Sequence, residues 1–270
     1  LGICMSKETM VYLSQLGVDK NKLCFINPAH DGIIQIKKIV VGMACRVQSD
    51  GRKREYFLNK LTKVLDPKFF RFKIIGDGWE PQVENLANNN FEVDYYGHFD
   101  YLEYVNFFSN LDYYLYMGMD EGQMGFIDAL AAGINTIVTS QGYHLDAPNA
   151  ITHPFTSYNE LEKIFLSIQD RKKQLIDSVA TWNWFDYAKK HLEIWNYLLD
   201  ENNNHSDFYD GLNTLLFPYK SDITTNKMLI GKNLLSLIKT KHLQRYYNIR
   251  RKIRENGIST LFYSIIRNFK

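Results

Sequence analysis

Short apolar segments alternate with helix-like segments along the first two hundred residues, and this alternation constrains the fold more than any other feature. Residues 37–44, KKIVVGMA, form a β-branched apolar run that is typical of a buried strand. Further strand-like runs follow at RFKIIG, FEVDYYG, DYYLYMG and INTIVTS. Helical patterns of about ten residues separate them, and residues 157–199 carry a helical pattern throughout. This order predicts an α/β fold in which a parallel sheet carries helices on both faces.

Glycine-bearing loops follow the strand-like runs at their carboxyl ends. These loops contain Gly76, Gly78, Gly97, Gly118, Gly122 and Gly142. In open parallel sheets, ligands bind beyond the carboxyl ends of the strands. Glycine also lets the backbone approach a ligand closely. The placement of these glycines therefore favours a nucleotide site at this edge of the sheet.

The loop after DYYLYMG carries acids beside the expected start of a helix. Asp120 and Glu121 precede Gly122, and the next backbone N–H groups begin a helix without internal partners. Together with the helix dipole, such groups form a cradle for phosphate. Asp128, further along the helix, is placed to accept hydrogen bonds from two ribose hydroxyls. Taken alone, the segment is equally consistent with a capped helix that carries Asp128 as a surface acid.

Basic residues follow the first strand-like run. Arg46 comes directly after it, and Arg52, Lys53 and Arg54 follow Gly51. A guanidinium binds phosphate oxygens in a bidentate manner and lysine supplies a point charge, so a basic pair at a strand end suits a diphosphate. Alone, GRKRE is more typical of a solvated surface run. The sequence offers no His, Asp and Glu cluster with metal-ligand spacing, so no metal is expected.

The cysteine content and the hydropathy of the chain indicate in which cellular compartment the protein is expected. Cys4, Cys24 and Cys45 are odd in number and widely spaced, which indicates neither a disulfide framework nor a zinc site and fits a reducing compartment. No uncharged apolar stretch approaches the ~20 residues that span a bilayer. We therefore expect a cytoplasmic protein. Because the chain starts at Leu1 without a methionine, we also expect a fragment or a processed protein.

The carboxyl-terminal part, residues 201–270, is predicted to be a polar linker and a basic amphipathic helical tail. Residues 220–270 contain 12 Lys and Arg but two acids, whereas the rest of the chain contains 20 basic and 28 acidic residues. Apolar residues from Ile258 to Phe269 recur at spacings of three and four. Two interpretations stay open: an in-plane helix on the anionic inner face of the membrane, or a helix packed on its own protein with solvated charges. Nucleic acid is not expected as a partner, because the body of the chain is acidic.

Several segments, in order, resemble the donor-binding domain of retaining GT-B glycosyltransferases of the family 4 (group 1) type. VVGMACRVQSDGRKREYFLNKL resembles its strand with Gly-Arg and Lys-Gly segments, and FKIIGDGWEPQVENLA resembles its Val-Gly-x-Gly-Pro stretch. MDEGQMGFIDALAAGINTIV is similar to its paired-acid motif and its Ala-x-Ala-x-Gly-x-Pro segment. The resemblance covers roughly residues 36–199. It implies a Rossmann-like nucleotide-sugar-binding domain over residues 36–200. Residues 1–35 resemble the family's interdomain segment or a remnant of its acceptor domain.

The resemblance also implies roles for individual residues. Arg46, with Arg52 or Lys53, would hold the donor diphosphate, and Asp128, shorter than the family's usual Glu, would bind the ribose. The first motif acid, which touches the sugar, is either Asp120 or Glu121, so the implied catalytic residues are Asp120, Glu121 and Arg46. The implied donor-binding set is Arg46, Arg52, Lys53, Gly76, Gly78, Tyr96, His98, Gly122, Gln123, Met124, Gly125 and Asp128, with Tyr96 and His98 flanking the base pocket.

The function implied by the resemblance is hexosyl transfer from a UDP- or GDP-sugar, with retention, to a glycan or a lipid-linked glycan. Such enzymes stabilise the departing diphosphate with cationic groups and a helix N-terminus, and no metal or other cofactor is expected. Two alternatives stay open: a nucleotide-sugar-binding subunit that needs a partner chain, and a sugar-nucleotide epimerase of the same fold. Complete enzymes of this type carry an acceptor domain of comparable size, so three alternatives stay open: the acceptor domain was removed, it is a separate chain, or this domain works differently.

Overall fold

The computed structural model describes residues 1–19 and 22–199, and these form two compact units. The larger unit is Gly32–Ala180, and the smaller one joins Leu1–Asp31 to the chain from Thr181 onward. The predicted basic tail, residues 201–270, lies outside the described residues. None of the helices in the described residues combines the length and the apolar character that crossing a membrane requires.

The larger unit is built on a six-stranded sheet with the strand order β5-β4-β3-β6-β7-β8, in which every pairing is parallel. The strands are β3 (Ile39–Ala44), β4 (Phe70–Ile75), β5 (Glu92–Tyr96), β6 (Tyr113–Tyr116), β7 (Asn135–Thr139) and β8 (His153–Phe155). The predicted α/β fold with a parallel sheet is confirmed. Strand β8 was not predicted, because it has only three residues and contains Pro154, and proline counts against a strand except at a sheet edge.

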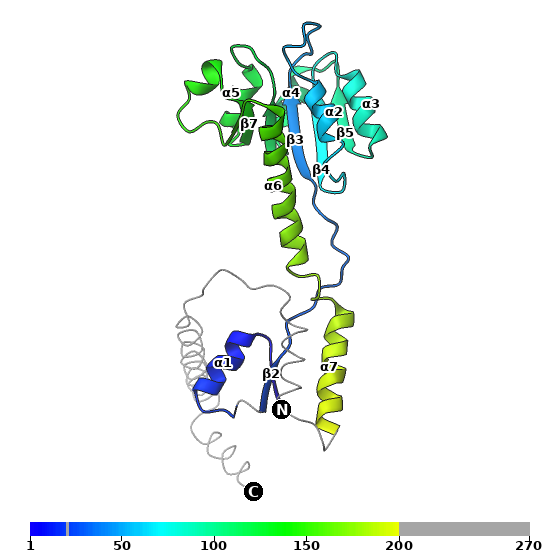
Figure 1. Ribbon diagram of the computed structural model, residues 1–270, viewed down its shortest axis with the longest axis vertical. Coiled ribbons are helices and arrows are strands. Elements are labelled where there is room, and N and C mark those ends of the chain that lie inside the picture. Colours follow the sequence, from blue (N-terminus) through cyan, green and yellow to red (C-terminus); the bar gives the residue numbers. More distant parts are fainter. Residues whose placement is uncertain (20–21, 200–270) are drawn as a thin grey trace, which may run out of the picture. The chain divides into compact units, whose positions relative to one another are not determined.

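Helices flank this sheet on both faces (Figure 1). They are α2 (Tyr56–Leu61), α3 (Glu80–Asn88), α4 (Tyr101–Phe108), α5 (Met124–Ala131) and α6 (Tyr158–Asp177), with the 3-10 helix η2 (Gly142–Leu145). The chain runs outward from β3 to β5, returns to β6, and then runs outward in the opposite direction. Right-handed crossovers therefore place α2 and α3 on one face and α4 and α5 on the other. The order reverses between β3 and β6, which is the point where open sheets bind ligands.

The core follows from this layering. Because both faces of the inner strands are covered, β3, β6 and β7 are almost entirely buried, and β3 has an apolar sequence throughout. Edge strand β5 instead keeps charged residues, and Asp94 of β5 accepts hydrogen bonds from Arg71 of β4 at 2.8 Å. Phe165 of α6 packs against Phe70 of β4, with ring centroids 5.7 Å apart.

The smaller unit contains a parallel pair of short strands, β1 (Gly2–Cys4) and β2 (Leu23–Phe25), with helices α1 (Lys7–Gln15) and α7 (Trp184–Leu199). Ile194 of α7 is buried in one cluster with Met10 and Phe25. Helix α7 therefore belongs with the amino-terminal segment, whereas the sequence assigned residues up to 200 to the nucleotide-sugar-binding domain. Periodicity predicts such a helix but does not identify the surface against which it packs.

Candidate functional site

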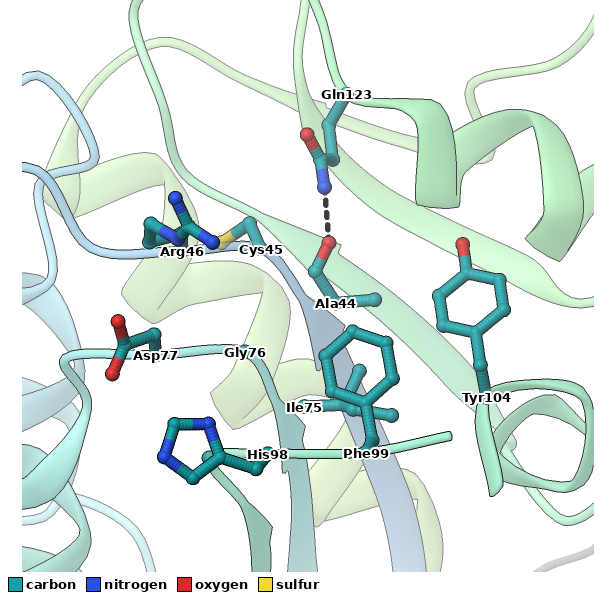
Figure 2. A pocket seen from close by; sticks show the side chains of 11 residues that line it. Ala44, Cys45, Arg46, Ile75, Gly76, Asp77, His98, Phe99, Tyr104 and Gln123 are labelled. Atoms are coloured by element: carbon teal, nitrogen blue, oxygen red, sulfur yellow. Dashed lines mark hydrogen bonds between the residues drawn. The ribbon is translucent and has the colours of Figure 1, made fainter. Parts of the chain in front are cut away.

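A cavity of about 400 Å³ opens at the carboxyl ends of β3, β4 and β5, close to the point where the strand order reverses (Figure 2). Its volume lies within the range of small-molecule sites. The residues that line it are Ala44, Cys45, Arg46, Ile75, Gly76, Asp77, Gly97, His98, Phe99, Tyr104 and Gln123. Every one of these residues belongs to the larger unit. The predicted glycine-lined edge of the sheet therefore borders a cavity.

The ends of β3 and β4 lie against each other at the floor of the cavity. Gly76 has a φ of +123°, and a Cβ built there would come within 2.3 Å of the Cys45 carbonyl oxygen. The same oxygen accepts a hydrogen bond from the indole N–H of Trp79 at 2.7 Å. No side chain fits between the two strand ends, so glycine is required at position 76 for steric and conformational reasons.

Arg46 is the cation of the cavity wall. It lies two residues after the end of β3 and is exposed, and none of the ion pairs among the described residues involves it. One acid, Asp77, lies on the same side of the cavity in Figure 2. The guanidinium of Arg46 is therefore available to an anion that enters the cavity.

The start of α5 forms the opposite wall. Gln123 is the N-cap residue, and its side-chain amide donates a hydrogen bond to the Ala44 carbonyl at the end of β3 (Figure 2). Its backbone N–H donates to His144 Nε2 at 3.1 Å. The first N–H groups of the helix, on Met124 and Gly125, have no acceptor within the helix and carry its positive dipole end. Gln123 lines the cavity, and the N–H groups of Met124 and Gly125 lie directly after it in the chain.

His144 holds that helix start in place. It is completely buried, and its Nδ1 donates to the Thr139 carbonyl at 3.1 Å, which leaves Nε2 as the acceptor for Gln123. Burial lowers the pKa of His144 below its usual value, in keeping with a neutral ring. The sequence gives no signal for this role of His144, because burial of a single histidine in a loop leaves no periodic pattern.

The acidic loop between β6 and α5 interlocks with the loop after β7. Gly122 has a φ of +133°, and a Cβ there would lie 2.6 Å from the Tyr143 ring. Tyr143 donates its backbone N–H to the Glu121 carbonyl at 3.0 Å, and a Cβ on Gly142 would lie 1.9 Å from the same oxygen. The backbone of Glu121 is therefore fixed, while its side chain is exposed.

Lys53 and Asp120 form a largely buried ion pair. Lys53 Nζ donates to Asp120 Oδ2 at 2.6 Å and to the Tyr116 hydroxyl at 2.7 Å. The Tyr116 hydroxyl in turn donates to the other oxygen of Asp120. Burial alone would raise the pKa of Asp120, but the hydrogen bonds from Lys53 and Tyr116 outweigh it and lower the pKa below its usual value. Tyr116, which the sequence analysis did not assign, therefore links the candidate cation to a candidate acid.

The other two basic residues of this loop have different environments. Arg52 is exposed and pairs with Asp50 at 3.3 Å. Arg54 is 5% exposed and donates to the carbonyls of Met117 at 2.5 Å and Thr156 at 2.7 Å. Arg52 and Lys53 were both predicted as partners of Arg46. The side chain of Lys53 binds Asp120 of the acidic loop, whereas that of Arg52 pairs with Asp50.

Asp128 lies on α5 and accepts a hydrogen bond from the Tyr104 hydroxyl of α4 at 2.5 Å. Burial raises the pKa of Tyr104 well above its usual value, and the hydrogen bond to Asp128 adds to the shift. Tyr104 lines the cavity and Asp128 does not. The sequence did not indicate Tyr104, because α4 precedes α5 by a full strand and only the fold joins them.

The cavity brings together some of the predicted residues and leaves others nearby. Arg46, Gly76, His98 and Gln123 line it, whereas Arg52, Lys53, Gly78, Tyr96, Asp120, Glu121, Gly122, Met124, Gly125 and Asp128 do not. Phe99 lines the cavity beside His98, where Tyr96 was expected. Among the described residues, no group of three His, Cys, Asp or Glu side chains is arranged to hold a metal ion.

No protein-family model matches the chain, and no curated protein matches it either. Three solved structures are similar to this chain, and two of them are named as glycosyltransferases. One, from Rickettsia africae, is 15% identical over 74% of this chain and 64% of its own, with a TM-score of 0.38. The catalytic domain of a cholesterol-alpha-glucosyltransferase from Helicobacter pylori is 14% identical over 58% of this chain and 99% of its own, with a TM-score of 0.40. Anabaena HepE in complex with UDP and glucose is 14% identical over 72% of this chain and 62% of its own, with a TM-score of 0.38.

This chain therefore spans less than two thirds of the length of two of these three structures. The identities and scores are too low to transfer the role of any residue.

Proposed function

We propose that the larger unit, Gly32–Ala180, is the donor-binding domain of a retaining GT-B glycosyltransferase that takes a hexose from a UDP- or GDP-sugar. One observation carries the proposal. The cavity lies between an unpaired arginine, Arg46, and the N-terminus of α5, at the point where the strand order reverses. Nucleotides bind at this position in open parallel sheets, and both walls favour phosphate.

The donor diphosphate is assigned to the side of the cavity between Arg46 and α5. The guanidinium binds phosphate oxygens in a bidentate manner, and the N–H groups of Met124 and Gly125 supply donors backed by the helix dipole. The interaction of these groups with the diphosphate becomes stronger as the diphosphate departs and its negative charge grows. This lowers the barrier to sugar transfer. Lys53 is the second cation of the assignment.

The first acid of the motif is assigned to Glu121. Both oxygens of Asp120 accept hydrogen bonds, from Lys53 and from Tyr116, so this side chain is a positioning residue for Lys53. The side chain of Glu121 is exposed on a backbone that Tyr143 and Gly142 hold in place. A fixed backbone with a free carboxylate suits contact with the donor sugar.

The nucleoside is assigned to the part of the cavity formed by Gly97, His98 and Phe99 after β5. Aromatic rings offer a face for a nucleobase, and the glycine lets the base approach the backbone. A glycan or lipid-linked acceptor and a peripheral position on the inner face of the membrane complete the proposal. The basic tail that motivates the membrane part lies outside the described residues.

Calorimetry on the full chain tests the donor site with UDP, GDP and ADP and with the matching nucleosides. We expect a diphosphate to bind more tightly than its nucleoside. Arg46→Gln should weaken diphosphate binding at least tenfold, because a hydrogen bond to a charged group contributes about 1.5–3 kcal/mol. Arg52→Gln is the matched control, since Arg52 is exposed and paired with Asp50.

If no nucleoside diphosphate binds at millimolar concentration, or if Arg46→Gln weakens nucleoside and diphosphate equally, the assignment of this cavity is wrong. Turnover is the second measurement. Release of sugar from the preferred donor, by the chain alone and after addition of acceptor glycans, separates an enzyme from a binding subunit that needs a partner chain.

A further inference from the structure

The bond between Tyr104 and Asp128 joins two helices at the edge of the cavity. Tyr104 lies on α4 and Asp128 on α5, and the distance from the phenol oxygen to Asp128 Oδ2 is 2.5 Å. The raised pKa of Tyr104, caused by burial and then by this bond, keeps the phenol protonated. The tyrosine is therefore the donor, and the carboxylate is the acceptor.

Only one member of this pair faces the cavity. Tyr104 is among the lining residues and Asp128 is not, although Asp128 is the residue predicted to hold the ribose. Aspartate is one methylene shorter than glutamate, and one of its oxygens is occupied by the tyrosine. Of these two side chains, the tyrosine therefore borders the cavity and the carboxylate lies behind it.

The tyrosine ring is held from two sides. It stacks on Phe99, with centroids 5.9 Å apart and an interplanar angle of 26°, and meets Phe108 edge-on at 5.3 Å. Figure 2 shows the Tyr104 ring at the cavity wall beside Phe99, with its hydroxyl directed to the side where Gln123 lies. The hydroxyl therefore has a fixed position, and fixed polar groups give a pocket its specificity.

A phenol that donates its proton to a carboxylate remains an acceptor. The hydroxyl carries one donor and two acceptor lone pairs, and chains of hydrogen bonds strengthen one another. A ribose hydroxyl can therefore donate to Tyr104 while Tyr104 donates to Asp128. The hydrogen bond to the Asp128 carboxylate polarises the phenol, so the Tyr104 oxygen becomes a stronger acceptor.

We propose that Tyr104 is a specificity-determining residue of the donor site, which accepts a hydrogen bond from a ribose hydroxyl and is held for this purpose by Asp128. The inference rests on the proposed function, because it assumes that a nucleotide occupies the cavity. It assigns to Tyr104 the contact that the sequence assigned to Asp128.

Calorimetry on the full chain is the test, with the preferred nucleoside diphosphate and its 2′-deoxy and 3′-deoxy analogues. The wild type should favour the ribonucleotide over at least one analogue. Tyr104→Phe should weaken ribonucleotide binding about three- to tenfold, the range for one hydrogen bond, and should change binding of that analogue less than twofold. Tyr101→Phe is the matched control, because Tyr101 lies on the same helix and is 82% exposed.

Two further variants test the role of Asp128. Asp128→Asn should reduce the ribose preference, and adding Tyr104→Phe to it should cause little further loss, because the two residues act as one unit. Asp128→Glu in the Tyr104→Phe background should restore the preference, because the longer carboxylate reaches the cavity. Thermal melts of each variant confirm that the fold is intact.

The inference is overturned if Tyr104→Phe weakens the ribonucleotide and both analogues equally, or leaves all three unchanged. Either result leaves diphosphate binding, and hence the proposed function, standing. If the wild type binds no nucleoside diphosphate at all, the proposed function fails and the inference fails with it.

Discussion

Asp120→Asn tests whether Lys53 is held by a buried ion pair beside the candidate site. The side chains of Lys53 and Asp120 are 9% and 22% exposed, and Nζ lies 2.6 Å from Oδ2. Removing one partner of a buried pair costs about 3–5 kcal/mol, because it leaves an uncompensated charge. Asparagine keeps an oxygen for Lys53, and the site is partly exposed, so we expect a loss of about 2 kcal/mol in the free energy of unfolding.

A double-mutant cycle isolates the pair. Lys53→Met, Asp120→Asn and the double variant should give a coupling energy of about 1.5–3 kcal/mol in urea unfolding followed by circular dichroism. Asp50→Asn and Arg52→Met in the same loop provide the control cycle, since those side chains are 54% and 46% exposed. Exposed pairs contribute about 0–1 kcal/mol. A coupling for Lys53 and Asp120 no larger than that of the control would refute the reasoning.

The pH dependence follows from the lowered pKa of Asp120. The unfolded chain takes up this proton near a pKa of about 3.9, before the folded chain does. The contribution of the pair is therefore fully present above the unfolded pKa and is lost as the pH falls through the folded pKa. The coupling energy should be constant from about pH 6 to 8 and should shrink below about pH 4.

Three further predictions concern the loops around the cavity. Gly76→Ala should destabilise the fold by more than the ~1–2 kcal/mol of backbone strain alone, because the new Cβ would also meet a carbonyl oxygen. Gly133→Ala should cost only the strain, because Gly133 has a φ of +72° and no atom lies near the position of its Cβ. Urea unfolding of the two variants compares these losses. His144→Leu should cost about 1–3 kcal/mol in the free energy of unfolding, because it leaves the backbone N–H of Gln123, the N-cap residue of α5, unpaired. Because burial lowers the pKa of His144, the stability of the wild type should decrease as the pH drops below about 6.5. The difference in unfolding free energy between the wild type and His144→Leu should therefore become smaller in that range. Glu121→Gln should reduce sugar turnover more than nucleotide binding, and if Asp120→Asn alone reduces turnover, the two acids are assigned in the wrong order.

Most of the sheet could be predicted from sequence because inner strands of a parallel sheet have continuous apolar sequences. Strand β3, IVVGMA, is of this kind, and strand β7, NTIVT, has an apolar pair between two buried threonines. Strand β8, HPF, could not be predicted, because three residues with a proline carry no period. Helix α7 was predicted, but the unit to which it belongs was not, because the apolar face of a helix does not indicate which part of the chain it packs against.

The candidate site was predictable only in part, for a related reason. Arg46, Gly76 and Gln123 follow strand ends, so topology alone brings them to one edge. The hydrogen bonds that position the functional groups instead join residues far apart in the sequence, as Tyr104 joins Asp128 across 24 positions. The sequence alone does not distinguish a tyrosine in the core or on the surface from one that contacts a neighbouring helix, as Tyr104 contacts α5.

The basic loop after β3 shows why charge patterns alone do not identify a phosphate site. GRKRE reads as a solvated run, yet the structure gives its three cations different environments: Arg52 exposed, Lys53 paired with Asp120, and Arg54 buried. Arg54 donates to the carbonyls of Met117 at 2.5 Å and of Thr156, so it ties this loop to the ends of β6 and β8. The candidate cation and the candidate acids are therefore fixed relative to each other before any ligand binds. Under the proposed function, a site preorganised in this way would lose little conformational entropy when a charged donor binds, and its charges would act on the departing diphosphate without rearrangement.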